Sequence, residues 1–116
     1  MESKVPIVNA NYSNINYKKM AESIGLSSKH IPILIVSFVD ETNSVMDNFK
    51  EAIDSNNYEK IKINAHSIKG SAGNLRFNEI YEMAKEMEIS ASLKREDFDY
   101  NGYLEAIKKA ILTIPN

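Results

Sequence analysis

The chain has 116 residues, of which 43% are hydrophobic and 26% charged, and its formal net charge is −2. This composition is typical of a globular domain, and the length allows one hydrophobic core without disulfides or a structural metal. Because the chain has no cysteine, disulfides, thiolate metal sites and cysteine nucleophiles are excluded. The lack of a basic surplus argues against nucleic acid as a partner.

The sequence shows no segment that suggests secretion or a membrane. The N-terminus has no basic stretch followed by an apolar one, and the longest apolar run, residues 31–39, is far shorter than the roughly 20 residues that span a bilayer. We therefore expect a cytoplasmic protein with no direct membrane contact.

The first 14 residues differ in character from the rest of the chain. They are rich in Asn and Ser, contain Pro6 and lack a sustained period, so we expect residues 1–14 to be a tail or linker and residues 15–116 to be the folded domain. A short helix is predicted over residues 17–24, with Asn16 as its N-cap and Gly25 as its C-terminal stop.

Four longer helices are predicted from apolar residues that recur every three or four positions. The second helix extends to about Ser55, with Ser27 or Ser28 as its N-cap and Pro32 in its first turn, and Asn57 is the predicted N-cap of the third. The apolar or small residues facing the core are Ile31, Ile35, Phe38, Thr42, Val45, Phe49 and Ala52; then Ile61, Ala65, Ile68, Ala72 and Leu75; then Phe77, Ile80, Ala84, Met87 and Ala91; and finally Tyr100, Leu104, Ile107, Ile111 and Ile114.

No segment alternates with the period of a β-strand. Four amphipathic helices joined by short links predict an all-α fold, an antiparallel up-down-up-down four-helix bundle with the short N-terminal helix packed across one end. Because of Gly102, the sequence does not decide where the first turn of the last helix begins.

His66 is the candidate functional residue. At about 100° of rotation per residue it lies roughly 160° from Ile68 on the core stripe, so its ring should face solvent. Residues three and four positions away share its face: Lys62, Ile63, Lys69, Gly70 and Gly73. Glycine lowers helix stability by about 1 kcal/mol relative to alanine, so these two exposed glycines favour a surface that another molecule approaches closely.

The chemistry of this face suits an anionic group. A neutral imidazole has a free ring nitrogen that can act as a nucleophile, and lysine is a mobile positive charge suited to a phosphoryl oxygen. The other histidine, His30, is expected to be a solvated residue near the start of the second helix. Two histidines on different helices and no cysteine argue against a zinc site.

The segment "AHSIKGSAGNL", Ala65 to Leu75, resembles the signature of histidine-containing phosphotransfer (HPt) domains, and the similarity extends over roughly residues 17–113. The resemblance implies a phosphorelay carrier of two-component systems, as in bacteria, in which His66 is the phosphoacceptor, Lys69 stabilises the phosphoryl group and Gly70 gives the partner access. It makes Ser67 and Ser71 weaker candidates for partner contact and Gly73 a source of clearance. Lys62 and Ile63 are candidate partner contacts because they share the face of His66.

The resemblance also implies the partners. These are receiver domains of response regulators and a sensor histidine kinase, to which the domain could be fused in a hybrid, membrane-bound kinase. The receiver would supply the aspartate and the magnesium ion, so the domain itself is expected to be a monomer without cofactor, metal or catalysis of its own. Phosphoryl transfer needs in-line geometry and charge neutralisation more than covalent chemistry, which fits this division.

One residue departs from the family pattern. Arg76 stands where glycine is common, and a left-handed conformation there costs a non-glycine residue roughly 1–2 kcal/mol. Either the helix ends in another way, for example with Asn78 capping the next helix, or the turn is strained.

Two other functions remain open from the sequence. The domain could be a helical module that docks receiver domains without carrying phosphate, in which case a large side chain at Gly70 would matter but His66 chemistry would not. His66 could also be a general base, although the sequence identifies neither a pocket nor a carboxylate partner for it.

Overall fold

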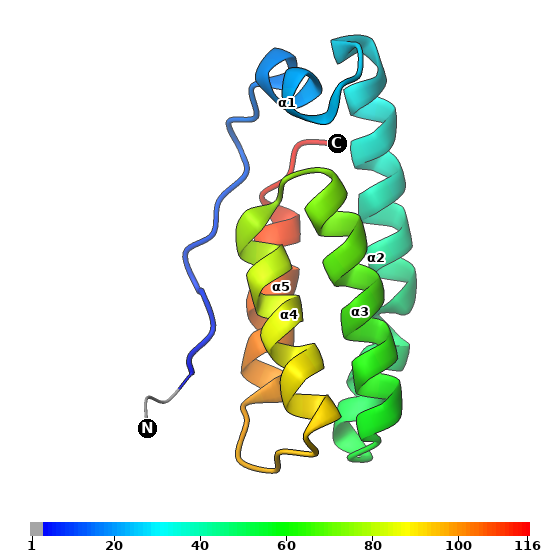
Figure 1. Cartoon of the computed structure of the whole chain (residues 1–116), viewed down its shortest axis with the longest axis vertical. Helices are drawn as coiled ribbons and strands as arrows, with labels where there is room; N and C mark the ends of the chain where they lie inside the picture. The colour runs from blue at the N-terminus through cyan, green and yellow to red at the C-terminus, as the bar shows by residue number, and fades with distance from the viewer. Residues whose placement is uncertain (1–3) are drawn as a thin grey trace.

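The computed structural model describes residues 4–116 (Figure 1). Within this range the chain forms five α-helices, one 3-10 turn and no strand, which confirms the all-α prediction: α1 (Tyr17–Ile24), η1 (Ser28–His30), α2 (Ile31–Asp54), α3 (Tyr58–Asn74), α4 (Asn78–Ser92) and α5 (Tyr100–Leu112). None of the described helices is both long enough and apolar enough to cross a membrane.

The four long helices form the predicted antiparallel bundle. Helix α2 packs on α3 and α5, and α4 packs on α3 and α5, so that each long helix touches two others around a common core. Successive helices run in opposite directions, and α1 lies at the end where α2 begins and α3 gives way to α4 (Figure 1).

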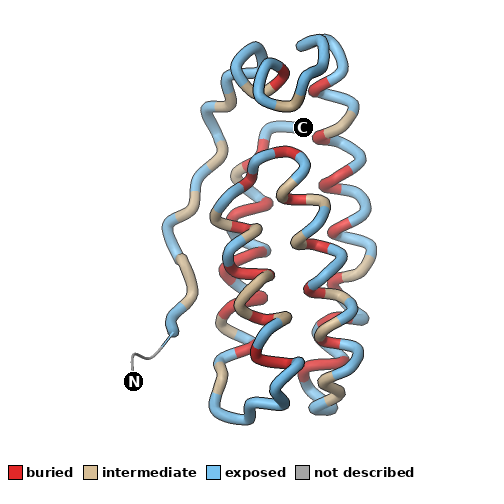
Figure 2. Tube along the Cα trace, in the orientation of Figure 1, coloured by how far each residue is buried: buried red, intermediate tan, exposed pale blue. Residues whose placement is uncertain are grey.

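The core consists of the residues that the helical spacing selected. Each residue of the four predicted stripes is buried except Val45, which is half-buried against the core. Figure 2 shows the buried positions on the inner faces of the helices and exposed positions outside. Since apolar burial drives folding, these stripes determine which face of α3 is left for solvent.

Two predicted N-caps are confirmed. Asn16 Oδ1 accepts the backbone N–H of Lys19 at 3.0 Å, and Asn57 Oδ1 accepts that of Lys60 at 3.1 Å. Gly25 ends α1 in the left-handed conformation, with φ of 84°.

Helix α5 begins at Tyr100, and Gly102 lies in its first turn. The capping carboxylate of Asp99 accepts the backbone N–H of Gly102 at 2.9 Å. A Cβ atom at Gly102 would collide with that carboxylate, so glycine here makes room for the cap.

The predicted serine cap of the second helix is wrong. Ser27 precedes the 3-10 turn without a side-chain capping bond, and the residue before α2 is His30, whose side chain makes no capping bond either. Pro32 lies in the first turn of α2, as predicted, where a missing backbone N–H costs no helical hydrogen bond. The 3-10 turn takes the place of the side-chain cap, because the backbone N–H of Ile31, the first residue of α2, bonds to the carbonyl of Ser28.

The turn at Arg76 is strained, which is one of the two alternatives that the sequence left open for the end of α3. Its φ is 63°, and the N–H of Phe77 bonds to the carbonyl of Ala72 at 3.0 Å, closing a Schellman turn at the end of α3. The Arg76 guanidinium donates to the Gly73 carbonyl at 2.9 Å and to Ser23 Oγ at 3.1 Å, which holds α1 against this turn. Asn78 is the first residue of α4 and not its cap.

The N-terminal segment forms no helix between residues 4 and 14, but it lies against the bundle. It runs along the side of α4 and α5 (Figure 1), and Ile7, Ala10 and Tyr12 pack on the core. Tyr12 bonds through its backbone N–H to Thr113 Oγ1 at 2.8 Å. Residues 1–3 of the expected tail lie outside the described residues.

Candidate functional site

His66 lies on the outer face of α3, as its position relative to the core stripe predicts. Its neighbours Ala65 and Ile68 are buried, whereas its own side chain is 68% exposed. The ring is therefore open to a macromolecule approaching from solvent, and the helix beneath it is fixed by the core.

A carboxylate that sequence reasoning missed contacts the ring. Glu88 on α4 places Oε2 2.7 Å from His66 Nδ1, and its side chain is only 19% exposed. Partial burial acts to raise the pKa of Glu88, but hydrogen bonds from Lys69 and His66 outweigh it and lower that pKa below its ordinary value. Glu88 is therefore ionised at neutral pH.

The two lysines beside His66 both have acidic partners. Lys69 Nζ lies 2.6 Å from Glu88 Oε1, while Lys62 Nζ lies 3.8 Å from Glu59 on the same helix. Lys69 is 25% exposed, so it is held beside the ring rather than extended into solvent. Glu88 thus contacts both His66, the candidate phosphoacceptor, and Lys69, the candidate phosphoryl-binding lysine.

The two glycines of the motif have different surroundings. A Cβ atom built at Gly70 would meet nothing within 4 Å, so this position is open beside His66. At Gly73 the same atom would lie 3.2 Å from Cδ2 of Tyr81 on α4. The space at Gly73 is taken by the protein's own tyrosine, which corrects the expectation that Gly73 provides clearance for a partner.

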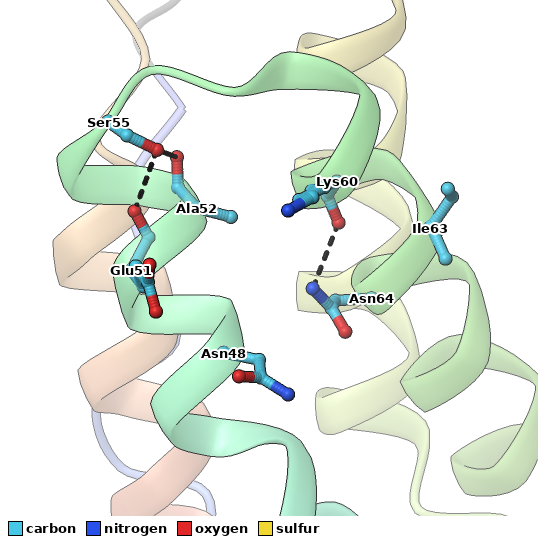
Figure 3. Close-up of a pocket in the computed structure, with 7 residues that line it drawn as sticks. All are labelled: Asn48, Glu51, Ala52, Ser55, Lys60, Ile63 and Asn64. Carbon is cyan, nitrogen blue, oxygen red and sulfur yellow. Dashed lines mark hydrogen bonds between the residues drawn. The ribbon is translucent and has the colours of Figure 1, made fainter.

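The remaining candidate contacts lie on the side of His66 that faces α2. Ile63 is 57% exposed, Ser67 is exposed and Ser71 is half-buried. Ile63 and Asn64 border a cavity of about 340 Å³ between α2 and α3 (Figure 3). Lys60 of α3 lines it too, and the opposite wall is formed by Asn48, Glu51 and Ala52 of α2 and by Ser55 directly after that helix. The surface around Ile63, one turn before His66, is therefore hollowed and mixed in polarity.

No group of three or more metal-ligating side chains of the His, Cys, Asp or Glu type occurs within residues 4–116. The one carboxylate at His66 already contacts two basic groups. The arrangement suits a nucleophile with a neighbouring cation on an open helical surface.

These features define an all-helical bundle that presents a histidine on the outer face of one of its four long helices. The chain matches the Hpt domain family over residues 34–112, a range from the first turn of α2 to the end of α5. The protein thus belongs to the Hpt family, whose members carry phosphoryl groups in histidine phosphotransfer of phosphorelays. No curated protein and no solved structure matches the chain.

Proposed function

We propose that this domain accepts a phosphoryl group on His66 from a receiver-domain aspartate and transfers it to the aspartate of another receiver. The observation that carries the proposal is the exposed His66 ring, held at Nδ1 by Glu88, within a domain of the Hpt family. With Nδ1 engaged, Nε2 is the ring nitrogen left for the phosphoryl group.

Lys69 and Gly70 support this assignment. The ammonium group of Lys69 contacts the second carboxylate oxygen of Glu88 and therefore lies beside the ring. A short movement of the flexible lysine side chain would bring its positive charge to a phosphoryl oxygen on His66. Gly70 leaves open space next to His66 for a partner surface. Ile63 and the cavity between α2 and α3 offer that partner an apolar contact and a hollow beside it.

The partner is expected to supply the remaining chemistry. Transfer between His66 and an aspartate needs a divalent cation to neutralise charge on the phosphoryl oxygens, and we assign a magnesium ion to the receiver domain. A sensor histidine kinase upstream and a response regulator downstream complete the proposed relay.

The test is phosphoryl transfer from a phosphorylated receiver domain in the presence of Mg²⁺. The wild-type chain should acquire acid-labile label, and H66Q should acquire none. H30Q is the matched control, because His30 is the other histidine of the chain and is also exposed; it should take label like the wild type. Label that persists in H66Q would overturn the assignment, and receiver binding without any label would favour the docking module.

A further inference from the structure

A groove lies at the end of the bundle where the N-terminal segment, α1 and the turn from α3 to α4 meet (Figure 1). Its volume of about 380 Å³ is within the range of small-molecule sites. Arg76, in that turn, follows His66 by about 15 Å along the axis of α3 at 1.5 Å per residue, so the groove is separate from the site of His66. The apolar side chains that line it are Tyr12, Ile15, Met20 and Phe77.

The charged side chains that line the groove are basic. Lys19 on α1 and Arg76 in the turn border it, and no Asp or Glu does so in the part of the chain that the structure describes. Glu22, one turn after Lys19, is exposed and outside the lining, and Glu79 already accepts a hydrogen bond from the Tyr12 hydroxyl at 2.7 Å. In a chain with a net charge of −2, the groove therefore combines an apolar floor with positive charge at its border.

The guanidinium group of Arg76 retains donors for a ligand. Of its five N–H groups, Nε donates to Ser23 Oγ at 3.1 Å, Nη1 to the Gly73 carbonyl at 2.9 Å and Nη2 to the Ser23 carbonyl at 3.2 Å. One N–H group remains on each terminal nitrogen, and two such donors match the two oxygens of a carboxylate. The existing bonds also fix the guanidinium at the groove, which reduces the entropy lost when it binds an anion.

We propose that this groove binds a small amphipathic carboxylate, with an apolar chain or ring of roughly eight to ten carbon atoms. The apolar part packs on Ile15, Met20 and Phe77, and the carboxylate lies between Lys19 and Arg76. An uncharged molecule would leave both cations without a partner. The volume of the groove suits a small molecule, whereas a peptide segment would extend beyond it.

Such a ligand contacts three parts of the fold at once. The N-terminal segment contributes Ile15, α1 contributes Lys19 and Met20, and the turn after α3 contributes Arg76. Because a ligand that binds only the folded state adds to its stability, binding should strengthen the packing of the N-terminal segment and α1 on the bundle. The inference does not depend on phosphorylation of His66, so H66Q should bind the ligand like the wild type.

The test uses sodium octanoate, with 1-octanol as the uncharged analogue and butyrate as an anion with a short apolar part. Binding to the nitrogen-15-labelled full chain is followed by the shifts of its backbone amide signals. We expect saturable shifts with octanoate around the groove, at Ser23 and Phe77 among others, with a Kd on the order of 1 mM from the usual binding energy per ligand atom. Octanol and butyrate should each bind there at least about threefold more weakly.

Substitution of the two cations tests the charge. K19Q and R76Q should bind octanoate about three- to tenfold more weakly than the wild type does, with no such loss for octanol. K18Q is the matched control, because Lys18 is an exposed lysine of α1 that does not line the groove, and it should bind octanoate like the wild type. The same spectra report whether each variant is folded.

Three results would overturn the proposal: no saturable shifts around the groove, equal affinity for octanoate and octanol, or equal weakening by K18Q and K19Q. Shifts of the same signals with protein concentration, in the absence of octanoate, would also contradict it, since a second copy of the chain would then occupy the groove.

Discussion

The hydroxyl of Tyr12 donates to Glu79 Oε1 at 2.7 Å and accepts the backbone N–H of Glu79 at 3.1 Å. It also accepts the N–H of Ile80 at 3.3 Å, so a side chain from the N-terminal segment performs the capping that no residue next to α4 provides. The Tyr12 ring packs on Phe77 with centroids 4.7 Å apart. The first turn of α4 thus depends on a residue far away in the sequence.

Replacing Tyr12 with phenylalanine keeps the ring and removes the cap. We expect Y12F to lose about 1–2 kcal/mol in the free energy of unfolding at pH 7, measured by urea denaturation, because two backbone N–H groups lose their acceptor. Burial and the hydrogen bond to Glu79 raise the pKa of Tyr12 above its ordinary value of 10.0. A raised pKa in the folded state stabilises the protein below that ordinary value, so the difference from Y12F should shrink as pH rises above 10.

Tyr17 offers a control for this substitution, since it is an exposed tyrosine on α1. Y17F should change stability by less than about 0.5 kcal/mol. If Y12F were as stable as Y17F, the capping role of Tyr12 would be wrong.

The turn at Arg76 provides a second prediction, through comparison with Lys94, which has φ of 52° at the end of α4. Glycine at either position relieves the left-handed strain by about 1 kcal/mol. K94G should gain most of this, because Lys94 is exposed and glycine keeps the bond from its backbone N–H to the carbonyl of Ala91 at 3.0 Å. R76G should gain less, because it loses the contacts of the guanidinium with Ser23 and Gly73.

Thermal denaturation of the two variants checks this comparison, and amide exchange in α1 should rise in R76G alone. Equal stabilisation by both substitutions, with unchanged exchange in α1, would mean that the Arg76 contacts contribute nothing measurable.

The sequence predicts the bundle well because its information is local. Apolar spacing within one helix selects the buried face, so the stripe around Ile68 also places His66 in solvent. The caps Asn16 and Asn57 act on backbone groups only three residues away, and for this reason they too can be recognised. The fold and the exposure of the candidate phosphoacceptor therefore follow from short-range rules.

The contacts of Tyr12 and Glu88 are long-range, and periodicity within one helix contains no information about them. A signal for Glu88 exists, however, in the antiparallel register of α3 and α4. Two pairs of residues that face each other across the turn lie at equal distances in sequence from Phe77. One pair is His66 and Glu88, and the other is Gly73 and Tyr81. Counting outward from the turn would have found both pairs, but only once α3 and α4 are known to pack directly. For Tyr12, no comparable rule links an irregular segment to a helix start.

The ion pairs of Glu88 should make the free energy of unfolding depend on pH in the acid range. Because the pKa of Glu88 is lowered from its ordinary value of 4.5, its contribution is present above that pH and is lost as the pH falls through the folded-state value. We expect the free energy of unfolding of the wild type to exceed that of E88Q by about 1 kcal/mol at pH 7. This difference should begin to shrink near pH 4.5 and vanish only once the pH is below the folded-state pKa of Glu88, where the carboxylate is protonated in both states. Urea midpoints at several pH values measure it, with E82Q as the reference, since Glu82 is an exposed glutamate of α4. A difference between wild type and E88Q that persists unchanged at low pH would contradict the role assigned to the charge.

Gly70 and Gly73 should separate stability from phosphotransfer. G70A places a methyl group in open space on a helix, so we expect it to stabilise the domain by up to about 1 kcal/mol, and G70L should also not destabilise it. If the partner approaches over Gly70, the leucine side chain should nevertheless slow transfer from a phosphorylated receiver at least tenfold. G73A is the matched control: its methyl group presses on Tyr81, which offsets the gain in helix propensity, and it should leave transfer unchanged. Transfer by G70L at the wild-type rate would show that the partner does not use the space beside His66, and greater stabilisation by G73A than by G70A would refute the packing role of Gly73.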